Sequence, residues 1–282
     1  MQICAREFTQ SDLDWIQYQV DNYAGINRVK LSRLFCRHVD WRKPDGGLKE
    51  MSCRVAMLRL YRNGLIRLPA PKTRSGAVKP IKRTAMGEPK DDIFLKAGQV
   101  KIVLEPVSPK TAPLYNELMD RYHYLGHRRM GGAQMRFFVY AGDQRVVLLG
   151  FSASAWRVAP RDEFIGWTED QRKRKLHLVV DNSRFLLLPW VHSKNLASRI
   201  LSGAARHLPY YWQERYNYSP LLLETFVEKN RFAGTCYKAA NWTCVGQTQG
   251  RGKWDTQKKY AAPVKTIWMY PLDRRFKEGL CQ

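Results

Sequence analysis

The chain has 282 residues, of which 44% are hydrophobic and 12% aromatic, enough to bury the core of one large domain or two smaller ones. No apolar run reaches the roughly 18 residues of a membrane-spanning helix, and the N-terminal MQICAREFTQSDLDW contains no apolar segment of a secretory signal. These features exclude an integral membrane protein, and we expect a cytoplasmic one.

The charge balance is strongly basic, with 48 Lys and Arg residues against 25 Asp and Glu residues and a formal net charge of +23. Such an excess predicts an anionic partner. DNA or RNA is the first candidate, because the neutralisation of phosphates supplies most non-specific affinity for nucleic acid. A membrane partner is not expected, since no basic amphipathic helix with a wide apolar face is present. The alternative is a solvated basic surface without a partner.

The cysteines are scattered, without a CxxC pair or zinc-finger spacing. We interpret them as reduced thiols of a cytosolic protein. Cys36 and Cys53 are expected in the core.

Residues 1–68 predict a small helical domain. Apolar residues recur at helical spacing over residues 13–23, with Ser11 as the N-cap, over residues 28–39 and over residues 48–62. Residues 65–68 predict a short strand. Three short helices followed by a strand are typical of a winged helix-turn-helix domain. The alternative is a helical bundle with an ordinary charged surface.

The third of these helices carries a basic face. Its predicted inward residues are Met51, Val55, Leu58 and Leu60. Its predicted outward residues, which would contact DNA, are Lys49, Arg54, Arg59 and Arg62. The domain is therefore expected to bind duplex DNA.

Residues 69–99 are expected to form a basic, proline-rich linker. Four prolines alternate with Lys and Arg, and apolar periodicity is absent. The segment either follows a phosphate backbone or acts as a spacer.

Residues 100–282 show alternating strand and helix patterns. Strands are expected at residues 100–107, 135–140, 146–155, 184–188, 221–227 and 266–271, and helices at residues 108–124, 171–175, 195–215 and 232–242. This order is that of the GNAT acyltransferase fold. We therefore expect an α+β protein, in which a winged helix-turn-helix is followed by a GNAT-like mixed α/β sandwich. The order of elements alone does not give the function.

A polar turn at residues 191–194 leads into the helix that begins at residue 195. The N–H groups at a helix N-terminus bind anions, and Lys194 lies beside them. In GNAT enzymes this turn has the pattern Q/R-x-x-G-x-G/A and holds the pyrophosphate of acyl-CoA. Here His192 and Asn195 replace the Gln or Arg and the first glycine, so we expect a nucleic acid phosphate rather than acyl-CoA. The alternative is an ordinary helix capped by Ser193 or Asn195.

Carboxylates beside apolar runs form a second candidate site. Glu224 lies in LLLETFV, which is too apolar for an edge strand, and a buried carboxylate needs a partner. Asp162 or Glu163 could join Glu224 in phosphodiester chemistry, with Asp162 and Glu224 as ligands of Mg²⁺ or Mn²⁺. The alternative, which the residues favour, is a pair between Glu224 and an arginine such as Arg184.

Two glycine-containing loops carry further basic residues. GHRRMGG supplies Arg128 and Arg129, and QTQGRGK supplies Arg251 and Lys253. We expect all four to contact nucleic acid phosphates.

Cys236 and Tyr237, in GTCYKAANW, are candidate catalytic residues. In an acyltransferase the cysteine could be a nucleophile and the tyrosine could protonate a leaving thiolate, although packing is the commoner role of such residues. His123 and His127 have the spacing of zinc ligands but lack the glutamate of HExxH. Residues 181–183 could also be only a turn at the entry of a strand.

Several long segments resemble the DruA family of the Druantia anti-phage system. They are WRKPDGGLKEMSCRVAMLRLYRNGLIRLP, RDEFIGW, DNSRFLLLPWVHSKNLAS, RYNYSPLLLETFV and RFAGTCYKAANWTCVGQTQGRG. The resemblance covers nearly the whole chain. It implies a bacterial protein linked to phage defence or to mobile elements, and it implies no catalytic residues.

These features lead to three hypotheses. The first is a DNA-binding protein whose ligands are duplex DNA and also single-stranded DNA. It would cleave DNA strands with a metal ion, as a nuclease or transposase does. The second is an acyl-CoA-dependent acyltransferase. The third is a DNA-binding adaptor for a helicase or nuclease partner, with steep salt dependence and no turnover.

Overall fold

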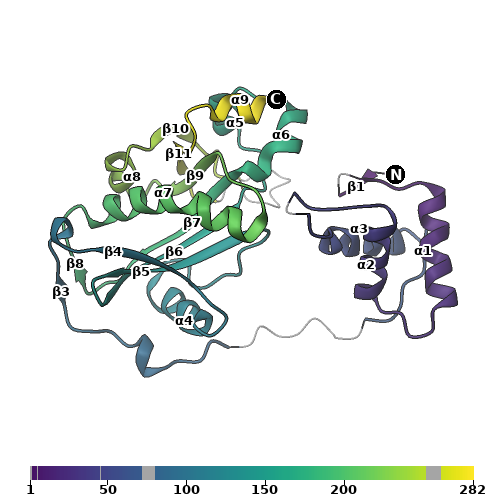
Figure 1. The fold of residues 1–282 in the computed structure, drawn as a ribbon, viewed down its shortest axis with the longest axis horizontal. Coiled ribbons are helices and arrows are strands. Elements are labelled where there is room, and N and C mark those ends of the chain that lie inside the picture. The colour runs from purple at the N-terminus through teal and green to yellow at the C-terminus, as the bar shows by residue number, and fades with distance from the viewer. Residues whose placement is uncertain (1, 5, 45, 72–79, 252–261) are drawn as a thin grey trace. The chain divides into compact units, whose positions relative to one another are not determined.

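The computed structural model describes residues 2–4, 6–44, 46–71, 80–251 and 262–282 of the chain (Figure 1). The chain divides into two units, Met1–Pro80 and Ile81–Gln282. Within the described ranges, none of the helices combines the length and the hydrophobicity needed to cross a membrane.

Unit 1 contains three helices and a short pair of strands. The helices are α1 (Gln10–Asn22), α2 (Arg28–His38) and α3 (Glu50–Arg62), and β1 (Gln2–Ile3) pairs antiparallel with β2 (Arg6–Glu7). The three predicted helices are confirmed. The N-cap of α1 is Thr9 rather than Ser11, because Thr9 and Asp12 bond to each other's backbone N–H groups in a capping box.

The predicted wing strand at residues 65–68 is wrong. The backbone N–H of Arg67 donates to Oε1 of Gln17 in α1 at 2.9 Å, and the Arg67 guanidinium lies 2.8 Å from the carboxylate of Asp21. The backbone N–H of Leu65 donates to the last turn of α3 at 3.0 Å. These donors bond to a helix end and to a side chain instead of to a second strand. The described part of unit 1 is therefore a three-helix domain without a wing at this position.

The buried face of α3 also differs from the predicted one. Its buried residues are Cys53, Ala56, Met57 and Leu60. This set follows the i, i+3, i+4, i+7 spacing of a helix face. Met51 and Val55, which were predicted to point inward, are 63% and 42% exposed and share the outer side with Arg59 and Arg62. Cys36 and Cys53 are fully buried, as expected.

Unit 2 is built on a seven-stranded sheet. In spatial order the strands are β10 (Thr243–Gln247), β11 (Lys265–Pro271), β9 (Leu222–Glu228), β7 (Val179–Leu187), β6 (Gln144–Ala153), β5 (Gln134–Ala141) and β4 (Ile102–Pro106). Neighbouring strands are antiparallel except β7 and β9, which are parallel. All the predicted strands of unit 2 are present. β7 starts at Val179 rather than at residue 184, and β10 was not predicted.

The helices of unit 2 are α4 (Ala112–Tyr122), α5 (Ala159–Ile165), α6 (Glu169–Lys175), α7 (Leu196–Tyr216), α8 (Thr235–Ala239) and α9 (Phe276–Cys281). The four predicted helices are confirmed, and α5 and α9 are additional. α7 forms the crossover that a parallel pair of strands requires, between β7 and β9.

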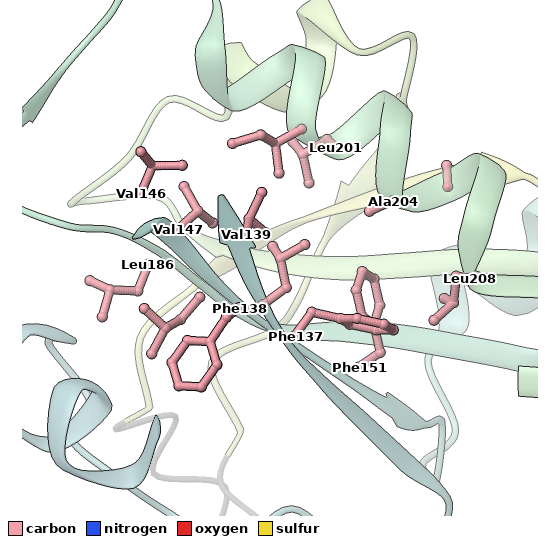
Figure 2. Close-up of a cluster of buried hydrophobic side chains, with 14 of the residues drawn as sticks. Phe137, Phe138, Val139, Val146, Val147, Phe151, Leu186, Leu201, Ala204 and Leu208 are labelled. Carbon is pink, nitrogen blue, oxygen red and sulfur yellow. The ribbon is translucent and has the colours of Figure 1, made fainter. Parts of the chain in front are cut away.

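The sheet is the middle of three layers. Successive residues of β5 point to opposite faces, so Phe137 contacts Tyr211 of α7 and Phe138 contacts Tyr115 of α4, at ring-centroid distances of 5.3 and 5.7 Å. Figure 2 shows buried residues of α7 directed toward the sheet: Leu201, Ala204 and Leu208. The core holds β7 and β9 at the centre of unit 2.

Residues 81–99 belong to unit 2, although their composition predicts a linker. They contain the short 3-10 turns η1 (Ala85–Gly87) and η2 (Ala97–Gln99), and β3 (Ile93–Phe94), which pairs in parallel with β8 (Val191–His192). The buried carboxylate of Glu117 in α4 accepts hydrogen bonds from the backbone N–H and the hydroxyl of Thr84, both at 2.7 Å. Burial alone would raise the pKa of Glu117, but these bonds and Arg121 outweigh it and lower the pKa. The ionised Glu117 thus fixes the segment to α4.

Gly87→Ala tests this packing. A Cβ at Gly87 would collide with the Glu117 carboxylate, so we expect the free energy of unfolding to fall by about 1 to 3 kcal/mol. Urea-induced unfolding of the full chain, followed by circular dichroism, measures the change. Gly98→Ala is the control, because a Cβ there meets no atom within 4 Å. Equal losses in the two variants would contradict the packing role of Gly87.

Candidate functional site

The pairing of β7 with β9 is short and leaves a fork between the strands. The register joins only Val179–Asp181 with Leu222–Glu224, and no further ladder pair connects the two strands in the part of the chain described. Beyond this point both strands line a cavity of about 650 Å³, together with residues 122–125 and 231–237. Strand edges that do not pair with each other offer peptide groups to a ligand, and the volume is that of a small-molecule site.

Hydrogen-bonded side chains close the fork next to its last ladder pair. The hydroxyl of Tyr237 donates to Oδ1 of Asn182 at 2.8 Å, and the hydroxyl of Thr225 donates to the Asn182 carbonyl at 3.0 Å. Burial raises the pKa of Tyr237, so the phenol keeps its proton and shares it with Asn182. Burial also raises the pKa of the Cys236 thiol, which lines the cavity. Cys236 is therefore a weak nucleophile, and the Tyr237 proton is already engaged.

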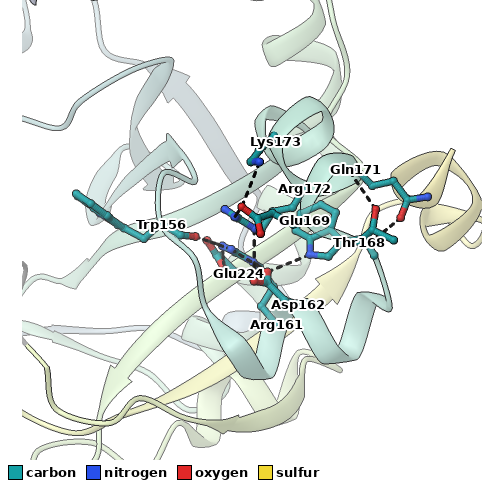
Figure 3. Close-up of polar contacts among 10 residues, drawn as sticks. Trp156, Arg161, Asp162, Thr168, Glu169, Gln171, Arg172, Lys173 and Glu224 are labelled. Atoms are coloured by element: carbon teal, nitrogen blue, oxygen red, sulfur yellow. Dashed lines mark hydrogen bonds and ion pairs between the residues drawn. The ribbon is translucent and has the colours of Figure 1, made fainter. Parts of the chain in front are cut away.

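Glu224 is paired with a buried arginine, as the favoured alternative expected, but the partner is Arg161 rather than Arg184. Arg161 and Glu224 are 0% and 2% exposed, and Nη1 of Arg161 lies 3.2 Å from each carboxylate oxygen. Ser154 also donates to Glu224. On its other side, Arg161 bonds to Oδ1 of Asp162 at 3.1 Å (Figure 3).

These carboxylates do not fit the predicted divalent ion. The Arg161 guanidinium bonds to both Asp162 and Glu224 and supplies the positive charge that a metal would bring. Oδ1 of Asp162 also accepts from the indole N–H of Trp167 at 3.0 Å, whereas Glu163 is exposed and takes no part. Among the residues described, no group of three His, Cys, Asp or Glu side chains is arranged to hold a metal ion. The cluster is a buried ion-pair network around one arginine.

Asp181 is a polar residue of the fork that the sequence pattern does not indicate as functional. It faces Glu224 in the last ladder pair, and its Oδ1 atom is buried without a hydrogen-bond partner among the described residues. Burial, and then the charge of Glu224, raises the pKa of Asp181 well above its usual value. The neutral acid is therefore favoured, and it offers both a donor and an acceptor. Asp181 also lines the cavity.

Aromatic and basic side chains line the solvent side of the cavity. Tyr124 and Phe232 are 39% and 51% exposed, and their rings meet edge to face at 5.5 Å. The Arg231 guanidinium lies 5.1 Å from the Tyr124 ring centroid, and His123 stacks on the same ring. Burial and the nearby Arg184 lower the pKa of His123 to about 4, so this imidazole is neutral at pH 7.

Two further depressions in unit 2 are cationic. One, of about 260 Å³, is lined by Arg128, Arg129, Arg136 and Arg184. The other, of about 690 Å³ at the start of α7, is lined by Lys96, Lys194, Arg199 and Arg206. The described residues lining these two depressions include no carboxylate. The predicted phosphate contacts Arg128, Arg129 and Lys194 thus lie in basic surroundings.

The start of α7 has an unusual backbone. Asn195 adopts φ = 60°, in the left-handed region where glycine is favoured and asparagine is tolerated. Asn195 is the N-cap residue, as one alternative expected, but its side chain makes no capping hydrogen bond, and Ser193 is not the cap. His192 bonds to Asp92 at 2.9 Å and stacks on Phe94 instead of reaching over the helix end.

The remaining predicted contacts lie elsewhere. In unit 1, Arg59 and Arg62 are exposed. Arg54 of α3 and Lys49, the N-cap residue before it, are half-buried. In unit 2, Arg251 is exposed. Lys253 lies outside the described residues.

A family model described as Druantia protein DruA matches residues 59–266. The chain belongs to the DruA family. The resemblance drawn from the sequence segments is thereby confirmed. No curated protein matches the DruA chain in sequence.

Several solved acetyltransferase structures are similar to this chain at low sequence identity. Aminoglycoside acetyltransferase AAC(6')-Ib in complex with coenzyme A is 13% identical, with a TM-score of 0.39 over 64% of the DruA chain and 98% of its own. A probable acetyltransferase from Staphylococcus epidermidis is 10% identical, with a TM-score of 0.39 over 61% and 99% of the two chains. A GNAT family acetyltransferase from Streptococcus pneumoniae is 11% identical, with a TM-score of 0.40 over 61% and 100%. At this similarity nothing about ligand or activity follows.

Arg161→Met tests the buried network. It leaves Glu224 buried without its cation, so we expect a loss of about 3 to 5 kcal/mol in the free energy of unfolding, measured in urea. Arg161→Met combined with Glu224→Gln should regain part of this loss, because the unpaired charge is removed. Arg172→Met is the control, since Arg172 lies 3.8 Å from Asp162 and should contribute about 1 kcal/mol or less. A small effect of Arg161→Met would contradict this interpretation.

Proposed function

We propose that this DruA protein binds DNA in anti-phage defence. Its family supports the role in defence. The observation that carries DNA binding is the pair of depressions in unit 2 that Arg and Lys side chains line, without a carboxylate among the described residues there. Cations gathered without acids attract a phosphate backbone and release its counterions. The net charge of +23 provides the same attraction over a longer range.

Unit 1 supplies a second DNA contact in this proposal. The outer side of α3 combines exposed Arg59 and Arg62 with exposed Met51 and Val55. Basic side chains bind phosphates, and apolar side chains contact thymine methyl groups in the major groove. An exposed helix face of this composition suits a recognition helix, although the predicted wing strand is not formed.

Neutralising the smaller depression should weaken DNA binding. For Arg128→Gln with Arg129→Gln, the slope of log affinity against log salt should fall by about 2 when both residues contact phosphates. Fluorescence anisotropy with a labelled duplex at several salt concentrations measures this slope. Lys110→Gln with Lys277→Gln removes the same charge from exposed positions that line neither depression. Equal effects of the two double variants would indicate a diffuse charge effect without a specific phosphate site.

The proposed role of α3 is tested in the same assay. Arg59→Gln with Arg62→Gln should lower duplex affinity by about tenfold, because two phosphate contacts are lost. Lys30→Gln with Arg37→Gln, at exposed positions of α2, is the matched control. Unchanged affinity of the α3 variant would remove this helix from the DNA interface.

The proposal includes no strand cleavage by Asp162, Glu163 and Glu224, because Arg161 already binds two of these carboxylates. We infer instead a DNA-binding adaptor that presents DNA to a helicase or nuclease partner. Incubation of the purified protein with Mg²⁺ or Mn²⁺ should leave supercoiled, linear and single-stranded DNA intact. Cleavage that Glu224→Gln abolishes, in a variant that remains folded, would contradict this.

One observation favours a second candidate function, acyl-CoA-dependent transfer. Asn195 adopts the left-handed backbone conformation that a glycine would adopt at the start of α7. The replacement of glycine by Asn195 therefore argues less strongly against a bound pyrophosphate than the sequence alone indicates. Calorimetry with acetyl-CoA distinguishes the two functions. We expect no binding at micromolar concentration, and binding in that range would revive the acyltransferase.

A further inference from the structure

We propose that the fork cavity of unit 2 holds one unpaired nucleotide of the bound DNA, with its base in the cavity and its phosphate against the cations at the solvent side. This inference rests on the DNA binding proposed above. It gives a ligand to the fork cavity. Contacts between the protein and the backbone of a duplex do not explain this cavity.

The cavity has the size and the walls for a nucleotide. Its volume of about 650 Å³ lies within the range of small-molecule sites. Phe185 of β7 and Phe226 of β9 lie on either side of the fork. Arg184 and Lys265 also line it, as does Arg231, which forms an ion pair with Glu228 at 3.1 Å. Aromatic walls and cations together suit a ligand that carries both an aromatic ring and an anionic group.

Tyr124 and Phe232 provide exposed rings where a base would stack. Both rings line the cavity while remaining 39% and 51% exposed. Large aromatic side chains are more often buried, so two exposed rings at the edge of one cavity mark a contact surface. Stacking on such rings is tolerant of sequence, because every base has a flat face.

Polar groups inside the cavity match the edge of a base. Oδ1 of Asp181 is buried and has no partner among the described residues, and such an atom is costly unless a ligand satisfies it. On His123, Nδ1 accepts the N–H of Leu125 at 3.2 Å, so the neutral ring carries its proton on Nε2. A carboxylic acid and an imidazole N–H offer two donors and one acceptor. Bases present complementary groups on their Watson–Crick edge once they leave the helix.

Arg184 connects the cavity with the cationic surface beside it. This residue lines both the fork cavity and the depression formed by Arg128, Arg129 and Arg136. A DNA backbone that crosses the depression therefore passes the cavity at Arg184. A single nucleotide can then leave the stack and enter the fork while its neighbours stay on the basic surface.

The test compares two labelled duplexes that differ by one unpaired adenine in the middle of one strand. In fluorescence anisotropy, the full-length protein should bind the bulged duplex about tenfold more tightly than the perfect one, through stacking of one base. Tyr124→Ala with Phe232→Ala should abolish this preference and leave the affinity for the perfect duplex unchanged. Retained duplex binding shows that the variant is folded. Tyr210→Ala, an exposed tyrosine of α7 that does not line the cavity, should keep the preference.

Asp181 is tested by a conservative and a disruptive change. Asp181→Asn keeps a donor and an acceptor and should retain the preference for the bulged duplex within about threefold. Asp181→Leu removes both and should reduce the preference by about tenfold. Equal behaviour of the two variants would exclude a hydrogen bond from this residue to the base.

The outcomes separate this inference from the proposed function. Failure to bind either duplex would overturn both. Equal binding of the two duplexes, or a preference that survives Tyr124→Ala with Phe232→Ala, would overturn the nucleotide site alone and leave DNA binding intact. Micromolar binding of acetyl-CoA together with equal binding of the two duplexes would assign the cavity to a coenzyme instead.

Discussion

The position at which β7 and β9 stop pairing determines the chemistry of unit 2. The last ladder pair places the carboxyl groups of Asp181 and Glu224 on adjacent strands at the centre of the sheet. Two buried charges of the same sign at this position would be costly. The structure resolves the conflict by pairing Glu224 with the buried Arg161 and by favouring the neutral form of Asp181. The strands then separate, and the cavity begins at the neutral acid.

The arginines of the chain therefore serve two different purposes. Arg161 is fully buried and neutralises carboxylates inside the protein, so it adds nothing to an external field. Arg128, Arg129 and Arg199 are exposed and line depressions without acids among the residues described. The net charge of +23 counts both kinds alike. The fold separates the buried arginine from the exposed ones. The general expectation of an anionic partner can therefore be narrowed to the two depressions that exposed arginines line.

The sequence predicted those features that depend on local periodicity. The helices of unit 1, the hairpin of β5 and β6, and α7 follow from apolar spacing, and burial of Glu224 follows from its apolar neighbours. The partner of Glu224 could not be predicted, because Arg161 lies 63 positions away in the chain and only the packing of α5 brings it close. Residues 65–68 have the apolar content of a strand, but their backbone finds partners in α1 and α3. Tertiary contacts decided each of these cases.

The role of Asp181 also depends on tertiary contacts, so it could not be predicted from local periodicity. The apolar run that marks β7 in the sequence begins after residue 184, so the polar residues 181–183 resembled a turn. In the structure they continue the strand, and all three residues line the cavity that begins at the last ladder pair of β7 with β9. A polar stretch inside a central strand is costly in a closed sheet and acceptable beside a cavity. The interruption of the apolar pattern was itself the signal of a site.

The start of α7 and the fork cavity differ in which anionic ligands they can distinguish. The start of α7 offers exposed cations and backbone N–H groups, which accept a phosphate from any source. The fork adds aromatic faces and the unsatisfied oxygen of Asp181, whose burial without a partner costs about 1 to 3 kcal/mol. Only a ligand with a matching polar group forms the missing hydrogen bond and removes this cost. A site with an unpaired buried group therefore discriminates between ligands that carry such a group and ligands that lack it. Affinity for phosphate can therefore be spread over the basic surface, whereas selectivity in unit 2 has to come from the fork.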